Sequence, residues 1–187
     1  MNVVIDAQII KHYFMESLSL KIEIPLTAKV TPLIDRLGQQ DKAFLDDSGQ
    51  IEQEWRNLVD PEWFQAWLGD LFLNDGVQEI AVQTELPLRK ELAKLGFPTQ
   101  GREGHDFWYI RAAKAVTRLQ AKLAKTKQPS AFIISEDLDF YEPKGKNKIK
   151  GAYRLDLLQS NRSPIGQFLL KHAQIQVYCV ANYLKES

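Results

Sequence analysis

The chain has 187 residues, of which 44% are hydrophobic and 26% are charged, and its formal net charge is zero. This length and composition predict one domain, residues 1–187, with a real hydrophobic core, and they exclude extensive disorder. No apolar run approaches the roughly 20 residues that a membrane span needs, and Met1 leads almost directly into a strand without a basic, apolar leader. We therefore expect a cytoplasmic protein with no membrane partner.

Charge is unevenly distributed along the chain. Residues 35–85 contain twelve acidic and three basic side chains, whereas residues 111–154 contain eleven basic and four acidic ones. The basic part could bind a phosphate backbone, and a solvated helix face explains part of it equally well. Because the chain has one cysteine, Cys179, and three scattered histidines, an internal disulfide is excluded and a zinc site is not expected.

The first half of the sequence predicts strands that alternate with helices. The expected elements are a strand at 2–6, a helix from Ala7 to Leu18, a helix from Thr27 to Gly38, a strand at 43–45, helices at 51–59 and from Pro61 onward, a strand at 79–84 and a helix at 86–95 ended by Gly96.

The second half continues the same alternation. It predicts the longest helix from Gly104 to Lys127, strands at 130–135 and 175–180, and between them a Lys-rich loop and a helix at Ile165–His172. Alternating strands and helices are typical of an α/β fold, here a three-layer α/β/α sandwich with a central parallel sheet.

A carboxylate follows the first predicted strand, because the β-branched run Val3-Val4-Ile5 leads directly into Asp6. In a parallel sheet, ligands bind at the carboxyl edge, so Asp6 is a candidate site residue by position. Asp is also a common cap for a helix that starts after a strand, and this interpretation stays open.

A second predicted strand also ends in acids. The run at 131–134 leads into Glu136, Asp137 and Asp139. If both strands are parallel members of one sheet, Asp6 and Asp137 lie at the same edge. One such acid is readily explained as a cap, whereas two indicate a shared site.

Two helices contribute further candidates. Glu54 falls on the same helical stripe as Ile51, Trp55 and Leu58, where a carboxylate is costly unless it is paired or binds a metal. Glu54 could also lie at the edge of the stripe and reach water. Asp106 opens the longest predicted helix, where it either joins a site or interacts favourably with the helix dipole.

Taken together, the four acids form the kind of ligand set that a hard divalent cation prefers. Mg²⁺ binds carboxylate oxygens and keeps several waters. Without a cation, crowded carboxylates would raise one another's pKa values. The pattern therefore predicts a site for Mg²⁺ or Mn²⁺.

The order of VVID, IEQEW, GHDFWYIRAAKA and ISEDLDF, followed by IQVYCVANYL, resembles the PIN-domain and PIN-like nucleases over residues 3–183. Carried over by position, the resemblance implies that Asp6, Glu54, Asp106 and Asp137 are catalytic metal ligands and that Asp139 is a supplementary one. The S-x-D-x-D-F motif is its most specific part. Gln8 departs from the family pattern, and the long segment 56–103 leaves Glu85 and Glu103 as rival acids.

The resemblance implies metal-dependent hydrolysis of phosphodiesters, with single-stranded or structured RNA as the substrate. Basic residues that follow Asp139 could grip the backbone: Lys144, Lys146, Lys148, Lys150 and Arg154. Two alternatives remain open. The chain could be a weak or inactive binding module of the same fold, or the toxin of a pair whose antitoxin-like partner blocks the acidic cleft. A homodimer is also compatible with the sequence.

Overall fold

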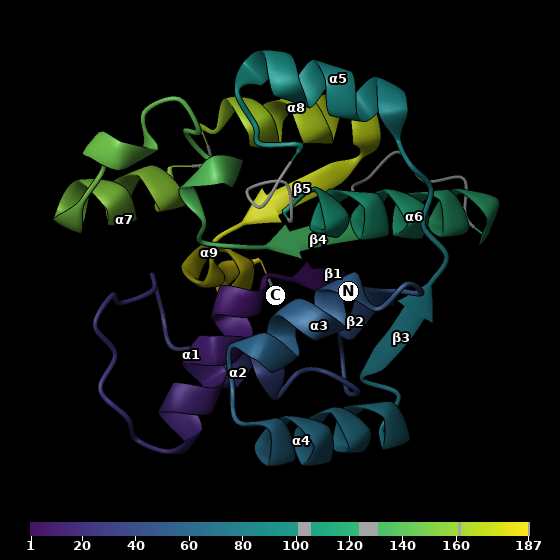
Figure 1. Ribbon diagram of the computed structural model, residues 1–187, viewed down its shortest axis with the longest axis vertical. Coiled ribbons are helices and arrows are strands. Elements are labelled where there is room, and N and C mark those ends of the chain that lie inside the picture. The colour runs from purple at the N-terminus through teal and green to yellow at the C-terminus, as the bar shows by residue number, and fades with distance from the viewer. Residues whose placement is uncertain (101–105, 124–130, 161, 187) are drawn as a thin grey trace.

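The computed structural model describes residues 1–100, 106–123, 131–160 and 162–186. Among these residues, five strands form one sheet in the order β3-β2-β1-β4-β5, and all neighbours are parallel (Figure 1). The strands are β1 (Asn2–Ile5), β2 (Lys42–Asp46), β3 (Val77–Ile80), β4 (Ala131–Ile134) and β5 (Ile175–Tyr178). The predicted parallel sheet is confirmed.

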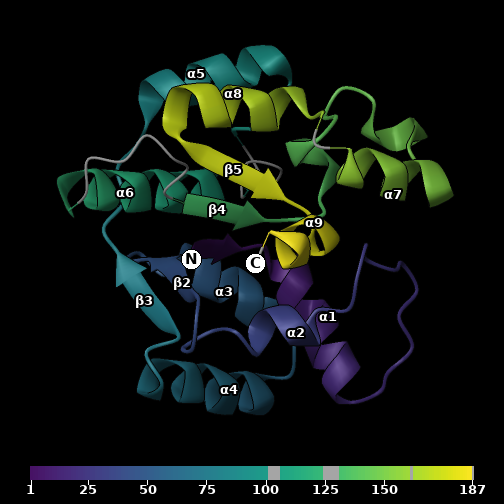
Figure 2. The same ribbon diagram turned by 180° about the vertical axis from the view of Figure 1, so that it is seen from behind.

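Helices flank the sheet and give the three-layer α/β/α sandwich that the sequence predicts. They are α1 (Ala7–Ser17), α2 (Thr31–Ile34), α3 (Gln50–Asn57), α4 (Pro61–Leu73), α5 (Leu86–Leu95), α6 (Phe107–Leu123), α7 (Gly151–Gln159), α8 (Pro164–Ala173) and α9 (Val180–Lys185). Because parallel crossovers are right-handed, α1 to α4 cover one face and α5, α6 and α8 the other. Figures 1 and 2 show α4 beside β3 and, at the opposite end of the sheet, α8 beside β5.

The core is built on the central strands. Val3, Val4 and Ile5 of β1 are completely buried, as are Ile133 and Ile134 of β4. A strand with helices on both faces has no solvent side, so its apolar residues run continuously instead of alternating. The helix α6 packs against all five strands and covers the centre of its face.

The predicted helix from Thr27 to Gly38 is wrong, because only Thr31–Ile34 is helical. Pro32 explains the difference. Proline has no N–H and is tolerated in the first helical turn but not in a helix interior, and a helix that began at Thr27 would place Pro32 inside it. The preceding residues instead form an irregular segment at 19–30.

Two other boundaries differ in detail. The strand predicted at 79–84 begins and ends earlier, as β3 at Val77–Ile80. Its first residue, Val77, pairs with Ala43 of β2. The longest described helix begins at Phe107, and the predicted span beyond Leu123 lies outside the described residues. The thiol of Cys179 is buried. Within the described ranges, no helix has both the length and the apolar character that crossing a membrane requires.

Candidate metal centre

The strands β1 and β4 lie side by side and end at the same level. Ile5 pairs with Ile134, and the Asp6 N–H donates to the Ile134 carbonyl at 3.0 Å. The strand order reverses between β1 and β4, since β2 and β3 follow on one side and β5 on the other. Such a switch point opens a crevice at the carboxyl edge of a parallel sheet. Acids follow both strands at this position.

Asp6 is both a helix cap and a member of the acidic site. Its Oδ1 accepts from the Gln8 N–H at 2.9 Å, which caps α1. Its Oδ2 accepts from the Ser135 hydroxyl. The Ser135 Oγ in turn accepts from the Asp137 N–H at 3.0 Å. One hydroxyl therefore connects Asp6, which follows β1, to Asp137, which follows β4. The two interpretations of Asp6 are therefore compatible.

Three carboxylates come together from different segments. Asp106 directly precedes α6, whereas Asp137 and Asp139 follow β4. Asp106, Asp137 and Asp139 each offer an oxygen, and these oxygens lie within 4.8 Å of one another. The Asp137 Oδ1 accepts from the Asp139 N–H at 2.8 Å and fixes the turn that carries both acids. This spacing allows one cation to contact all three side chains.

Glu54 reaches the same region through Tyr109. The Tyr109 hydroxyl donates to Glu54 Oε2 at 2.5 Å and accepts from the Ala7 N–H at 3.1 Å. Next to Glu54, the Trp55 Nε1–H donates to the Ile5 carbonyl at 2.9 Å. These bonds fasten α3 and the start of α6 to the end of β1. We call Asp6, Glu54, Asp106, Asp137 and Asp139 the acid group.

The electrostatics show that the acid group carries more negative charge than its surroundings favour. Burial, followed by the charges of Asp6 and Asp137, raises the pKa of Asp106 to about 9. Burial, followed by the charge of Asp137, raises the pKa of Asp6 to about 7, although the hydrogen bonds from Ser135 and Gln8 oppose the shift. Full ionisation is therefore unfavourable at neutral pH unless a cation compensates.

The predicted nucleic-acid-binding residues differ in their environments. Lys146 Nζ lies 2.8 Å from Asp139 Oδ2, in the acid group itself. The side chains of Lys144, Lys148 and Lys150 are exposed. Arg154 is largely buried and donates to the carbonyls of Pro25 at 3.2 Å and Glu136 at 2.9 Å. Arg154 thus braces the segment at 19–30, and its guanidinium is engaged in the fold.

Two further acids of the described residues, Glu85 and Glu136, have other partners. Glu85 forms an ion pair with Arg118, which lies twelve residues after Asp106 and hence about 18 Å along α6, so Glu85 does not join the acid group. Glu103 lies outside the described residues. Glu136 is buried and accepts from the Thr27 N–H at 2.9 Å, which makes it a structural acid.

Sequence reasoning missed two residues that position the acid group. Tyr109 lies three residues after Asp106, on the same side of α6, and this spacing was the available signal. Ser135 belongs to the S-x-D-x-D-F motif, but no role was predicted for its hydroxyl. Both act by holding acids in place.

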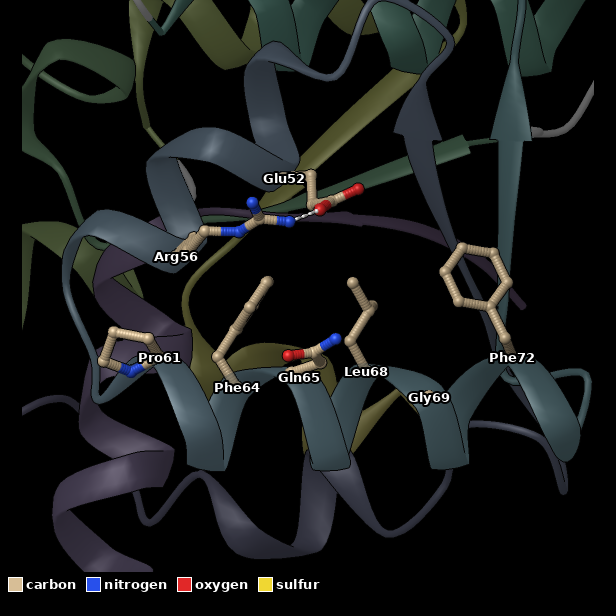
Figure 3. A pocket seen from close by; sticks show the side chains of 8 residues that line it. All are labelled: Glu52, Arg56, Pro61, Phe64, Gln65, Leu68, Gly69 and Phe72. Carbon is tan, nitrogen blue, oxygen red and sulfur yellow. Dashed lines mark hydrogen bonds and ion pairs between the residues drawn. The ribbon is translucent and has the colours of Figure 1, made fainter.

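A separate cavity of about 370 Å³ lies between α3 and α4 (Figure 3). Its α4 wall is formed by Phe64, Leu68 and Phe72. Opposite them lie Glu52 and Arg56 of α3, and these two side chains form an ion pair with each other. Residues two positions apart on a helix lie nearly on opposite sides, so Glu52 points away from the acid group that contains Glu54. Of the eight side chains that Figure 3 draws around this cavity, Glu52 alone is a carboxylate, so they form no acidic cluster.

No protein-family model, no curated protein and no solved structure matches this chain. The geometry and charge of the acid group are therefore what indicate a function.

Proposed function

We propose that this chain is a metal-dependent phosphodiesterase, specifically a PIN-like ribonuclease that uses Mg²⁺ or Mn²⁺. The supporting observation is the convergence of Asp106, Asp137 and Asp139, whose oxygens lie within 4.8 Å of one another at the carboxyl edge of the sheet. Asp6 and Glu54 extend the same negative region, because their charges contribute to the raised pKa of Asp106.

The donor set fits a hard divalent cation. Every member of the acid group offers carboxylate oxygens, which Mg²⁺ and Mn²⁺ prefer over nitrogen or sulfur ligands. Asp106, Asp137 and Asp139 would hold the ion, with Asp6 and Glu54 beside them. When bound, such an ion makes a water more acidic and neutralises charge on a phosphoryl group.

The other residues of the site prepare this arrangement. Ser135 holds Asp6, and Tyr109 holds Glu54, so neither carboxylate needs to reorganise when substrate arrives. Lys146 places a cation beside Asp139, next to where a phosphate would lie. The exposed Lys144, Lys148 and Lys150 follow along the chain and supply positive charge for the strand.

The decisive experiment combines Mn²⁺ titration calorimetry with cleavage of a labelled single-stranded RNA. Asp6→Asn and Asp137→Asn should each abolish cleavage and weaken Mn²⁺ binding by about tenfold or more, because a neutral amide is a poor ligand for a hard cation. The matched control is Asp70→Asn, on the exposed face of α4. Unchanged cleavage by both site variants would contradict the proposal, and Mn²⁺ binding without cleavage of RNA or DNA would favour an inactive binding module.

A further inference from the structure

A second cavity, of about 450 Å³, lies next to the acid group. Asp137 lines this cavity and is also a member of the acid group, so the two sites share one residue. The remaining walls come from α1, the segment at 19–30, the turn after β4 that carries Glu136 and Leu138, the turn at 146–148 and α7. Its volume is in the range of sites that bind small molecules or single groups of a larger ligand.

The wall formed by the segment at 19–30 is held in place although it has no regular secondary structure. Its residue Thr27 donates its N–H to Glu136 at 2.9 Å, and the Pro25 carbonyl accepts from Arg154 at 3.2 Å. Glu16 of α1 accepts from the Val30 N–H at 3.0 Å. These bonds fix Ile24 and Leu26 at the rim, so the cavity is preformed.

The chemistry of the walls matches a nucleobase. Gln8 and Asn147 present side-chain amides, which offer donors and acceptors like those on the edge of a base. Ile24, Leu26 and Leu138 present apolar surface that can contact the face of a base. Glu136 and Arg154 are engaged with backbone groups, so Lys146 is the cation placed to meet a phosphate.

We propose that this cavity binds one unpaired base of the nucleotide that adjoins the scissile phosphate. The proposal rests on the proposed nuclease function. Because Asp137 lies in both sites, a base in the cavity and a phosphate at the acid group are neighbours along one strand. A base in a duplex has its edge paired and its faces stacked, so it cannot enter such a cavity without being extruded.

The test measures binding without turnover. A fluorescein-labelled 12-nucleotide RNA, alone or annealed to its complement, is titrated with the protein in EDTA and followed by anisotropy. We expect the single strand to bind about tenfold more tightly than the duplex. Ile24→Ser and Asn147→Ala should each weaken single-strand binding by about fivefold or more, as removal of a base contact does, and leave duplex binding unchanged.

The cavity between α3 and α4 supplies matched controls (Figure 3). Phe72→Ser removes a partly exposed apolar side chain as Ile24→Ser does, and Gln65→Ala removes an amide as Asn147→Ala does. Both controls should bind RNA like the wild type. Equal affinity for single strand and duplex, or unchanged binding by folded Ile24→Ser and Asn147→Ala, would overturn the inference.

Cleavage assays separate this inference from the proposed function. Single-strand preference that depends on Ile24 and Asn147, without cleavage in Mg²⁺, supports the base site and contradicts the nuclease. Cleavage that depends on Asp137, with single strand and duplex cut equally by the wild type and by Asn147→Ala, supports the nuclease and overturns the base site.

Discussion

The Lys146 ammonium lies 2.8 Å from Asp139 Oδ2, so the cation of a side chain already sits among the acids that would hold a metal. Asp139 is buried, whereas Lys146 retains partial access to solvent. An ion that binds Asp139 must therefore compete with this ammonium, and its arrival would release Lys146 toward the cavity that it also lines. In the proposed nuclease, the ion pair would connect metal binding to the side of the site where substrate binds.

We predict that Lys146→Gln binds Mn²⁺ several-fold more tightly than the wild type, because the competing cation is gone, and binds RNA more weakly, because a phosphate contact is gone. Titration calorimetry and anisotropy measure the two effects. For Mn²⁺ affinity the control is Lys148→Gln, an exposed lysine on the same turn that has no ion pair with Asp139 among the described contacts. If both variants had the same Mn²⁺ affinity, the ion pair would have no part in metal binding.

The raised pKa values predict how stability depends on pH without metal. The pKa values of Asp106 and Asp6 rise from 3.8 to about 9 and about 7, so between pH 4 and these values the folded protein binds more protons than the unfolded chain. The free energy of unfolding should then fall as pH rises from about 4 to about 9. Asp106→Asn should flatten this dependence and raise Tm at pH 8 in EDTA by several degrees, at about 2–4 °C per kcal/mol.

Thermal unfolding at several pH values checks this prediction, with Asp70→Asn as the control. Saturating Mn²⁺ at pH 8 should stabilise the wild type more than Asp106→Asn, because the ion replaces the protons. A pH profile of Asp106→Asn that coincided with that of the wild type would show that crowding in the acid group does not affect stability.

The sheet and the position of the acids could be predicted because both follow from local sequence. The apolar runs at Val3–Ile5 and Ala131–Ile134 mark buried strands, and parallel strands bring whatever follows them to one edge. Asp6 and Asp137 could therefore be placed at one edge of the sheet without any knowledge of distances. Glu54 became a candidate because a carboxylate on an apolar stripe is costly unless it is paired or binds a metal.

The features that were missed depend on contacts between distant parts of the chain. Tyr109 and Glu54 are 55 positions apart, so the spacing of Tyr109 from Asp106 could indicate its side of the helix but not its hydrogen bond to Glu54. The shape of the segment at 19–30 depends on Glu16 and Glu136, which accept its N–H groups. In the sequence Lys146 resembles Lys144 and Lys148, and only the fold pairs it with Asp139.

Tyr109→Phe tests whether the hydroxyl positions Glu54. Its loss leaves the Ala7 N–H and Glu54 without this partner, so we expect a loss of about 1–2 kcal/mol in the free energy of unfolding. Mn²⁺ affinity should also fall several-fold, since Glu54 is no longer held beside the other acids. Tyr153→Phe is the control, because that side chain is 63% exposed. A drop in Tm with unchanged Mn²⁺ affinity would assign Tyr109 a purely structural role.

The final prediction concerns the exposed lysines that follow the acid group. Phosphate contacts position a strand without reading its sequence, so replacing Lys144, Lys148 and Lys150 with Gln should weaken binding to unrelated single-stranded RNAs alike. Each lost contact should reduce the slope of log affinity against log salt by about 0.7. Lys144 also packs its side chain against Gly96, and α7 begins directly after Lys150, so both side chains start from fixed positions beside the site.

The control replaces Lys90 and Lys171 with Gln, two exposed lysines on α5 and α8. These helices cover the β5 end of the sheet (Figure 1). Titrations at several salt concentrations should show a flatter slope for the triple variant and a wild-type slope for the control. Equal slopes for both variants would mean that the lysines after Asp139 are a solvated surface, and that RNA is held by Lys146 and the base cavity instead.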